Sequence, residues 1–391
     1  HIADRKSRGL IRSVRRMAPG AAVTVTGCHP QSAGFEAVRA LGADLVVGTR
    51  DADKAELVEF LATRTQEDRS KPGVAPLTGV RGSDAPGGPS GEARMHTRAF
   101  IKAQEGCHDV CAFCIVPRTR GREESRGIER VVAEVRRAVD EGVREVVITG
   151  TQLGAWGRDF EAPLKPHHLI AGVLEETDVS RLRFSSLQPQ DISPELLSLW
   201  SDPRVMPHFH LALQSGSDAV LQRMRRRYSA NEFVEAAERI RAVSPQAAIT
   251  TDVIAGFPGE TDEQFEETLA LCREVAFARI HCFQYSPRTR TAAARMAGHV
   301  SPEVRKERMG RLRQLNGELS IAFRSRFLGT TRPVLWETKQ PSKGGRRWFG
   351  HTDNYIGVYT EGDDLRNRLT PSLLSALYDD GVAGSCPPEE A

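Results

Sequence analysis

The chain has 391 residues and a net charge of only +3, with 39% hydrophobic and 27% charged residues. This length is enough for two or three domains, and the composition is that of a soluble globular protein. No apolar run approaches the roughly 20 residues that a membrane-spanning helix needs, and no signal peptide is visible, so we expect no membrane partner.

The first 65 residues alternate between helix and strand patterns, which is typical of an α/β domain. The predicted helices cover 5–16, 35–41 and 54–63, and the predicted strands cover 21–26 and 45–47. The chain begins with His1 rather than Met and its first residues read like the middle of a domain, so we expect an N-terminal truncation. Residues 66–93 are rich in glycine and proline, which predicts a linker.

From residue 94 the alternation of strand and helix returns. The predicted strands cover 96–104, 145–149, 182–186, 208–213, 248–254 and 279–285. The helices between them cover 129–141, 194–200, 219–225, 230–243 and 263–275, and a long basic helix over 303–327 closes the domain. About six such repeats predict a parallel sheet that curls into a full or partial barrel, with its site at the carboxyl ends of the strands.

Three cysteines follow the first of these strands, in a C-x3-C-x2-C pattern at Cys107, Cys111 and Cys114. A [4Fe-4S] cluster normally takes four cysteine ligands, so three leave one iron open for a bound molecule. Two alternatives stay open at this point: half of a zinc site that His108 or a distant cysteine completes, and plain core cysteines. The clustering of the cysteines favours metal binding over a disulfide framework and indicates a reducing compartment.

Polar or glycine-rich turns follow four other predicted strands. They are Gly150-Thr151-Gln152, Ser185 to Pro189, Gln214 to Ser217, and Phe257 to Thr261. Each alone fits a simple turn, but four on one barrel face predict a pocket. A basic cluster at Arg223 and Arg225 to Arg227 fits either a helix dipole or a phosphate partner.

Residues 328–391 change character and predict a small all-β module of OB-like kind. Short strands are predicted over 333–336, 347–349, 355–359 and 373–378. Seven basic residues between Arg324 and Arg347 accompany a single acid, Glu337, with Trp336 and Trp348 among them. Basic groups neutralise phosphates and aromatic rings stack on bases, so this stretch predicts nucleic-acid binding, with a solvated basic face as the alternative.

The cysteine pattern resembles that of the radical S-adenosylmethionine (SAM) enzymes. The longer run 114–126, together with 213–218, 251–261 and 285–288, resembles their methylthiotransferase branch. Within that branch, the runs 3–8, 153–159 and 352–356 are similar to enzymes that act on N6-threonylcarbamoyladenosine beside the tRNA anticodon. The resemblance covers essentially the whole chain.

This resemblance implies a domain order. Residues 1–65 would be the C-terminal part of an incomplete α/β methylthiotransferase domain, and 66–93 a linker. Residues 94–327 would form a radical SAM partial (β/α)6 barrel, and 328–391 a TRAM-like RNA-binding domain. Of the three cysteines expected to hold a second [4Fe-4S] cluster in the first domain, only Cys28 is in the sequence.

The resemblance also implies the reaction. SAM would chelate the open iron of a [4Fe-4S] cluster on Cys107, Cys111 and Cys114. The resulting 5′-deoxyadenosyl radical would take hydrogen from C2 of the adenine at tRNA position 37, and the second cluster would carry the sulfur. Because this C–H bond is unactivated, the cofactors carry the chemistry and no catalytic acid–base group is expected.

The implied site residues form two sets. The SAM site would comprise Gly150, Thr151, Gln152, Ser186, Gln188, Gln214, Ile254, Gly256 and Glu260. The RNA contacts would comprise Arg332, Lys343, Arg346, Arg347 and Trp348. The implied partners are the tRNA anticodon stem-loop, SAM and an electron donor such as flavodoxin or ferredoxin, for a monomer in the cytoplasm.

Some residues depart from the family pattern. Gln152 stands where asparagine is expected, Gln188 where glutamate is expected, and Thr289-Arg290 in place of Pro-Gly. Alternative functions are methylthiolation of N6-isopentenyladenosine at the same position, a radical SAM reaction without sulfur insertion, and a non-catalytic RNA-binding protein with a structural metal site. A branch that modifies a ribosomal-protein aspartate fits less well, because the C-terminal module is basic and aromatic.

Overall fold

The fold was analysed in a computed structural model. It describes residues 2–18, 22–26, 35–47, 57, 59–60, 97–362 and 364–386. The chain divides into two compact units: one comprises 1–94, 114–122 and 286–290, and the other comprises 95–113, 123–285 and 291–391. Cys28, most of the helix predicted over 54–63 and the linker predicted over 66–93 lie outside the described residues.

The first unit contains a small α/β arrangement. Its elements are α1 (Ile2–Met17), β1 (Thr24–Val25), α3 (Phe35–Arg39), β2 (Leu45–Val46) and α5 (Val116–Thr119). The two short strands pair in parallel, and Ile11, Val38 and Val46 bury their side chains in a common core. The helix–strand alternation predicted here is present in the described residues.

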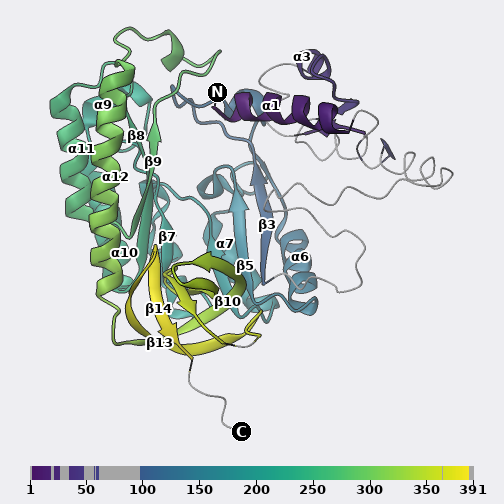
Figure 1. Cartoon of the computed structure of the whole chain (residues 1–391), viewed down its shortest axis with the longest axis vertical. Helices are drawn as coiled ribbons and strands as arrows, with labels where there is room; N and C mark the ends of the chain where they lie inside the picture. Colours follow the sequence, from purple (N-terminus) through teal and green to yellow (C-terminus); the bar gives the residue numbers. More distant parts are fainter. Residues whose placement is uncertain are drawn as a thin grey trace. The chain divides into compact units, whose positions relative to one another are not determined.

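The second unit is built on six parallel strands with helices on one face (Figure 1). The strands are β3 (Arg98–Glu105), β5 (Glu145–Gly150), β6 (Arg181–Phe184), β7 (His208–His210), β8 (Ala248–Ala255) and β9 (Arg279–Gln284). They form two sheets, β4-β3-β5-β6 and β7-β8-β9, with the short β4 (Glu124–Ser125) antiparallel to β3. Isolated parallel bridges from Leu182 to Val205 and from Leu187 to Leu211 link the sheets, so the strands form a partial barrel.

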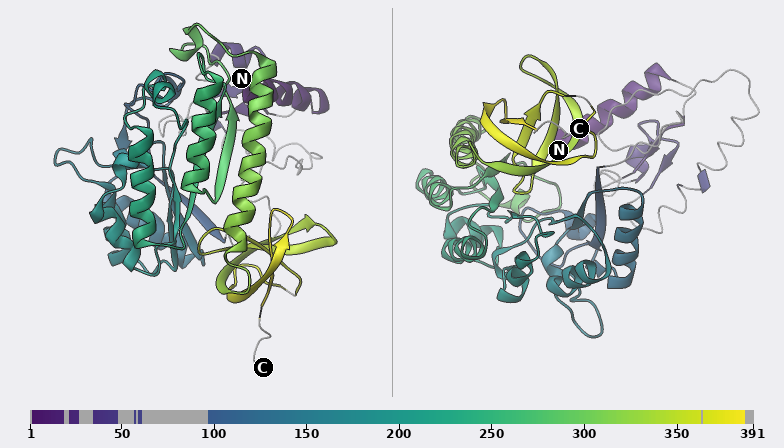
Figure 2. Two further views of the ribbon diagram at one scale, coloured as in Figure 1. Left: turned by 90° about the vertical axis from the view of Figure 1, so that its left-hand side faces the viewer. Right: turned by 90° about the horizontal axis from the view of Figure 1, so that it is seen from below.

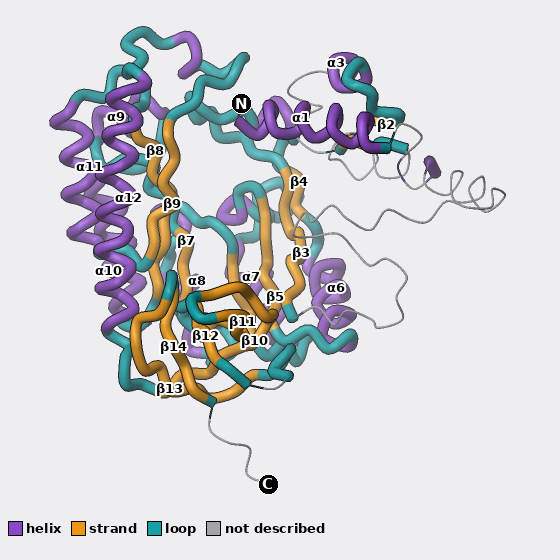
Figure 3. The backbone as a smooth tube through the Cα atoms, in the orientation of Figure 1, coloured by secondary structure: helices purple, strands orange, loops and turns teal. Residues whose placement is uncertain are grey.

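Helices alternate with these strands along the chain (Figure 3). They are α6 (Ile128–Asp140), α7 (Pro166–Glu176), α8 (Pro194–Leu197), α9 (Asp218–Met224), α10 (Ala230–Val243), α11 (Asp262–Val275) and α12 (Pro302–Ser325). Short 3-10 helices cover Leu153–Ala155, Pro189–Asp191, Ser198–Ser201 and Ala293–Arg295. None of the described helices is long and apolar enough to cross a membrane.

The strands have two chemically different faces because successive side chains alternate in direction. One face carries apolar residues such as Ile101, Ile148 and Val253, which pack in the main core beneath the helices. The concave face carries Arg98, Asp252 and His281. The predicted partial (β/α)6 barrel is therefore confirmed, and its concave face is polar.

The C-terminal segment forms a closed antiparallel-rich barrel in the order β10-β11-β12-β14-β13 (Figure 2). Its strands are β10 (Thr331–Ser342), β11 (Gly345–Thr352), β12 (Gly357–Thr360), β13 (Leu369–Tyr378) and β14 (Gly381–Ser385). Closure leaves no unpaired sheet edge. Gly350 and Gly381 are required where strands cross closely, because a Cβ at either position would overlap a backbone carbonyl. The barrel core continues into Phe323 in the last turn of α12 and Phe327 just after that helix.

Candidate active site

The cysteine loop follows the carboxyl end of β3. Cys107, Cys111 and Cys114 are half-buried, and Cys114 belongs to the first unit, two residues before α5 begins at Val116. Two N–H groups point at sulfur: the backbone N–H of Asp109 donates to Cys107 Sγ at 3.3 Å, and Arg226 Nη1 donates to Cys111 Sγ at 3.2 Å. Donors aimed at sulfur stabilise a thiolate, which is the form that binds metal.

A charged network fixes this loop from two other elements. Asp109 is buried, accepts a hydrogen bond from Gln188 Nε2 at 3.1 Å and pairs with Arg227 at 3.2 Å. Gln188 Oε1 in turn accepts from Arg226 Nη2 at 3.0 Å. The amide at position 188 can donate to the Asp109 carboxylate, whereas the glutamate expected there would repel it. The basic cluster at the end of α9 therefore serves the cysteine loop through Arg226 and Arg227.

The loop after β5 presents the next predicted residues. Gly150 lies against Gln104, whose Cβ is 3.0 Å from where a side chain at 150 would begin. Gln104 Oε1 accepts the backbone N–H of Gln152 at 2.8 Å. Thr151, between Gly150 and Gln152, is half-buried. Gln152 itself is buried, and its Nε2 has no hydrogen-bond partner among the residues that the structure describes. A buried donor of this kind is costly unless a ligand satisfies it.

The remaining predicted SAM contacts lie in the loops after β6, β7 and β8 and at the carboxyl end of β8 itself. Ser186 and Ile254 are half-buried, and Gln214 has a left-handed backbone (φ +69°) with its N–H bonded to Asp252 O at 2.8 Å. Gly256 also needs a positive φ, of +77°, and donates to Glu260 Oε2 at 2.7 Å.

Glu260 is engaged within the protein. Its carboxylate accepts from Arg308 of α12 at 2.7 Å as well as from the Gly256 backbone, and burial raises its pKa. It therefore holds the turn after β8 against α12. A direct contact from Glu260 to SAM stays a prediction.

Asp191 was missed by sequence reasoning. It is the last residue of the 3-10 helix Pro189–Asp191 that follows β6, and its Oδ2 accepts the backbone N–H of Gln188 at 2.8 Å. Burial raises the pKa of Asp191 to about 6. Gly154 faces this carboxylate so closely that a Cβ there would overlap it. The sequence signal that could have identified it is the Gln188-Pro189-Gln190-Asp191 turn, because a side chain three residues on often bonds the first backbone N–H.

The residues present fit an iron–sulfur cluster with SAM bound to it. Three cysteines within eight residues supply thiolate donors, two of them already receive N–H hydrogen bonds, and a buried amide donor lies unpaired in a neighbouring strand-end loop. His108, the residue that could complete a zinc site, is instead paired with Glu123 at 3.2 Å. The donor set therefore favours the cluster over zinc.

Comparison with known proteins decides the family. Residues 101–272 match the radical SAM superfamily. The chain is 35% identical, over 97% of its length and 84% of the relative, to "Threonylcarbamoyladenosine tRNA methylthiotransferase MtaB" of Bacillus subtilis. The chain belongs to the radical SAM methylthiotransferase family. It is accordingly a radical SAM tRNA methylthiotransferase, whose cofactors are SAM and [4Fe-4S] clusters.

Other relatives divide between two named activities. The MtaB protein of Thermotoga maritima is 35% identical over 94% of this chain and 81% of its own length. A "tRNA-2-methylthio-N(6)-dimethylallyladenosine synthase" of Maricaulis maris is also 35% identical, over 98% of this chain and 87% of its own length. Among solved structures, the radical SAM methyltransferase TsrM of Kitasatospora setae has a TM-score of 0.52, with 17% identity over 72% of this chain and 58% of that one, which is a likeness of fold alone.

The C-terminal barrel of this methylthiotransferase corrects part of the predicted RNA surface. Trp348 is only 4% exposed and lies in the barrel core, so it is not available for stacking on a base. Arg332 is buried and paired with Asp353 at 2.7 Å, which makes it a structural residue. Lys343 and Arg346 are exposed near the β10–β11 turn, and Arg347 is half-buried and paired with Glu361 at 2.6 Å. Contacts of Lys343, Arg346 and Arg347 with RNA stay predictions.

A buried charge cluster joins this barrel to the strands of the core. Glu145 of β5 pairs with Arg98 at 2.5 Å and with Arg181 and Arg183 at 2.9 Å each. The two last arginines also donate to the backbone carbonyl of Thr352 in β11, at 2.7 and 2.9 Å. Burial alone would raise the pKa of Glu145, but the three guanidinium groups outweigh it and hold the pKa at about 2.

Proposed function

We propose that this methylthiotransferase acts on N6-threonylcarbamoyladenosine at position 37 of tRNA and converts it to the 2-methylthio derivative. Two relatives that match nearly the whole chain carry this activity in their names, whereas others are named for the dimethylallyl substrate. The observation that carries the choice is the position of the run 352–356, whose sequence resembles the threonylcarbamoyl-specific subgroup.

This run places an aromatic side chain at the amino-terminal ends of the core strands. Tyr355 has a left-handed backbone (φ +67°) and stacks its ring on His208 at 4.4 Å and on His351 at 4.6 Å. The Arg98 and Arg183 guanidinium groups lie 5.3 and 4.8 Å from the same ring. The turn is locked from within, because Thr352 Oγ1 donates to Asn354 Oδ1 at 2.7 Å and accepts the Ile356 N–H at 2.9 Å. Tyr355 thus closes the concave face at the amino-terminal ends of the strands, where its ring can influence which modified adenosine fits.

The chain's own residues have binding and positioning tasks in this reaction. Cys107, Cys111 and Cys114 would hold the cluster, with Arg226 and the Asp109 N–H donating to two of the sulfurs. Gly150, Gln152 and Gln188 lie at strand ends around the loop and would orient SAM. When bound, SAM and the cluster supply the radical that removes hydrogen from C2 of the adenine. We infer further that a flavodoxin or ferredoxin supplies the electron.

The test uses synthetic anticodon stem-loops with N6-threonylcarbamoyladenosine or N6-isopentenyladenosine at position 37. The reconstituted protein is incubated with SAM and a reductant under anaerobic conditions, and the nucleosides are analysed by mass spectrometry. We expect one methylthio group on the threonylcarbamoyl substrate and none with a Cys107→Ala/Cys111→Ala/Cys114→Ala variant. Product from the isopentenyl stem-loop alone would refute the proposal and favour the second named activity.

A further inference from the structure

Three titratable side chains meet on the concave face of the partial barrel, one from each of β7, β8 and β9. Their ligand atoms, in His210, Asp252 and His281, all lie within 4.8 Å of one another. His210 Nε2 is 3.4 Å from Asp252 Oδ2, and the two imidazole centroids are 5.5 Å apart. His281 is exposed and the other two are half-buried. We refer to these three residues as the imidazole–carboxylate cluster.

Thr250 orients this cluster. Its hydroxyl oxygen lies 3.0 Å from His210 Nδ1, 3.3 Å from His208 Nε2 and 3.4 Å from the Phe209 carbonyl oxygen, to which it donates. His210 therefore turns Nε2 toward Asp252 and the open face. Partial desolvation of its ring and the neighbouring His210 imidazole lower the pKa of His281, which favours a neutral ring that can both donate and accept. The cluster thus presents mixed hydrogen-bonding capacity to whatever enters from the concave side.

Two phenylalanines flank the same face. Phe100 of β3 is 66% exposed and Phe283 of β9 is 50% exposed, although both belong to the strands of the core. They occupy the first and last of the six parallel strands, and by the alternation of side chains they share the concave face with Arg98 and His281. Exposed aromatic faces on a polar surface are the usual platform for an unstacked base.

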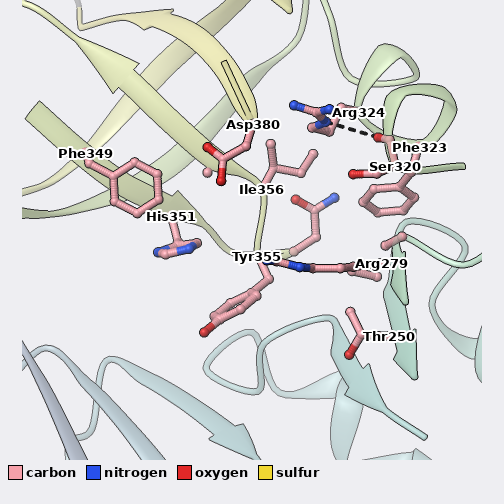
Figure 4. A pocket seen from close by; sticks show the side chains of 14 residues that line it. Thr250, Arg279, Ser320, Phe323, Arg324, Phe349, His351, Tyr355, Ile356 and Asp380 are labelled. Atoms are coloured by element: carbon pink, nitrogen blue, oxygen red, sulfur yellow. Dashed lines mark hydrogen bonds between the residues drawn. The ribbon is translucent and has the colours of Figure 1, made fainter. Parts of the chain in front are cut away.

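The cluster lies at a definite depth below the predicted SAM site. Ile254 is a predicted SAM contact near the carboxyl end of β8, and Asp252 precedes it by two residues, or about 7 Å along a strand. Thr250 is two residues deeper and is the register partner of Arg279. Arg279 is exposed and lines a pocket with Thr250, His351, Asn354 and Tyr355 (Figure 4). Moving away from the SAM end, a ligand would therefore meet the cluster first and Arg279 next.

We propose that the imidazole–carboxylate cluster and Arg279 bind the N6 substituent of the target adenosine, which rests on the function proposed above. C2 and C6 both flank N1 of the purine, but their substituents point in different directions, so a base with C2 toward SAM can direct its N6 group away from SAM and down β8. Arg279 and His281 then take the carboxylate of the threonylcarbamoyl group, and Asp252 accepts from its N–H or hydroxyl. An isopentenyl group offers these side chains no hydrogen-bond partner, so the site favours the threonylcarbamoyl group.

The test measures binding rather than turnover. Anticodon stem-loops with N6-threonylcarbamoyladenosine or unmodified adenosine at position 37 are titrated into the reconstituted protein, and the ratio of their affinities is recorded. Because each variant removes a hydrogen-bond donor to the substrate carboxylate, we expect Arg279→Ala and His281→Leu each to reduce that ratio by about tenfold or more. Arg137→Ala, an exposed arginine on α6, is the matched control and should leave the ratio unchanged.

Each outcome supports or overturns the inference. Arg279 is exposed, so its variant can be tested even if a cluster variant fails to fold. An unchanged affinity ratio in both variants would overturn the subsite while leaving methylthiolation of the threonylcarbamoyl substrate, and hence the proposed function, intact. Stoichiometric Zn²⁺ binding that persists in the triple cysteine variant but is lost in His210→Ala would overturn it by showing a metal site. Turnover of the isopentenyl substrate alone would instead refute the proposed function.

Discussion

Replacing Glu145 by glutamine should destabilise the protein strongly without changing side-chain shape. Glu145 is fully buried and is the shared partner of Arg98, Arg181 and Arg183. Its pKa falls from 4.5 to about 2 in the fold, which at 1.36 kcal/mol per pKa unit corresponds to about 3 kcal/mol of stability at neutral pH. Removing one partner of a buried ion pair costs a similar 3–5 kcal/mol or so, because the charges left behind are uncompensated.

Urea unfolding at pH 7, followed by circular dichroism, measures this loss. The matched control is Glu141→Gln, since Glu141 is an exposed acid on the end of α6 and should change stability by less than about 0.5 kcal/mol. Because the folded pKa lies below the unfolded value, the contribution of Glu145 is complete above pH 4.5 and disappears as the pH falls toward 2. The stability gap between wild type and Glu145→Gln should close over that range. A loss below about 1 kcal/mol at pH 7 would refute the reasoning.

Three further predictions concern the site and the barrel. Arg226→Met removes the N–H donor to Cys111 and should slow SAM cleavage at least tenfold at unchanged iron content, measured as release of 5′-deoxyadenosine. The control Arg239→Met, at an exposed arginine, should leave the rate of SAM cleavage unchanged. Gly154→Ala places a Cβ against Asp191 and should lower the free energy of unfolding in urea by about 1–3 kcal/mol. Gly310→Ala, which has open space around it in α12, should raise that free energy by about 0.5–1 kcal/mol. Equal effects of the two variants would contradict the steric argument. The double variant Lys343→Ala/Arg346→Ala should reduce the magnitude of the slope of log tRNA affinity against log salt concentration by about 0.7–0.9 per lost phosphate contact. Trp348→Ala removes a buried side chain and should instead destabilise the barrel by about 3–5 kcal/mol.

The core strands were predictable because each has a short β-branched or apolar run between turn signals. The strand predicted over 145–149 is β5 (Glu145–Gly150), and that over 248–254 is β8 (Ala248–Ala255). Helix α7 was not predicted, although Leu169, Ile170, Val173 and Leu174 form its buried stripe, because Pro166-His167-His168 opens it without a usual cap. Strand β14 was also missed, since Gly381-Val382-Ala383-Gly384-Ser385 reads as a turn until barrel closure supplies its partners.

The site was predictable only where its residues are adjacent in sequence. The spacing of the three cysteines predicts a cluster site directly. The hydrogen bond from Arg226 to Cys111 could not be predicted in this way, because it joins residues 115 positions apart. Glu145 reads as an ordinary polar residue at the start of a strand, and only the fold brings three arginines onto it. Trp348 shows the converse error: an aromatic residue among basic neighbours resembles a stacking platform, yet the pleat of β11 turns it into the barrel core.

The Glu145 cluster affects how fragments of this protein should be interpreted. Arg181 and Arg183 each donate one hydrogen bond to the Thr352 carbonyl, and Phe323 and Phe327 share their core with the C-terminal barrel. Deleting residues 328–391 to remove tRNA affinity would also strip two buried guanidinium groups of an acceptor and expose an apolar surface. Loss of activity in such a truncation would report on folding of the catalytic half as much as on RNA binding, so point substitutions at Lys343 and Arg346 are the cleaner way to separate the two.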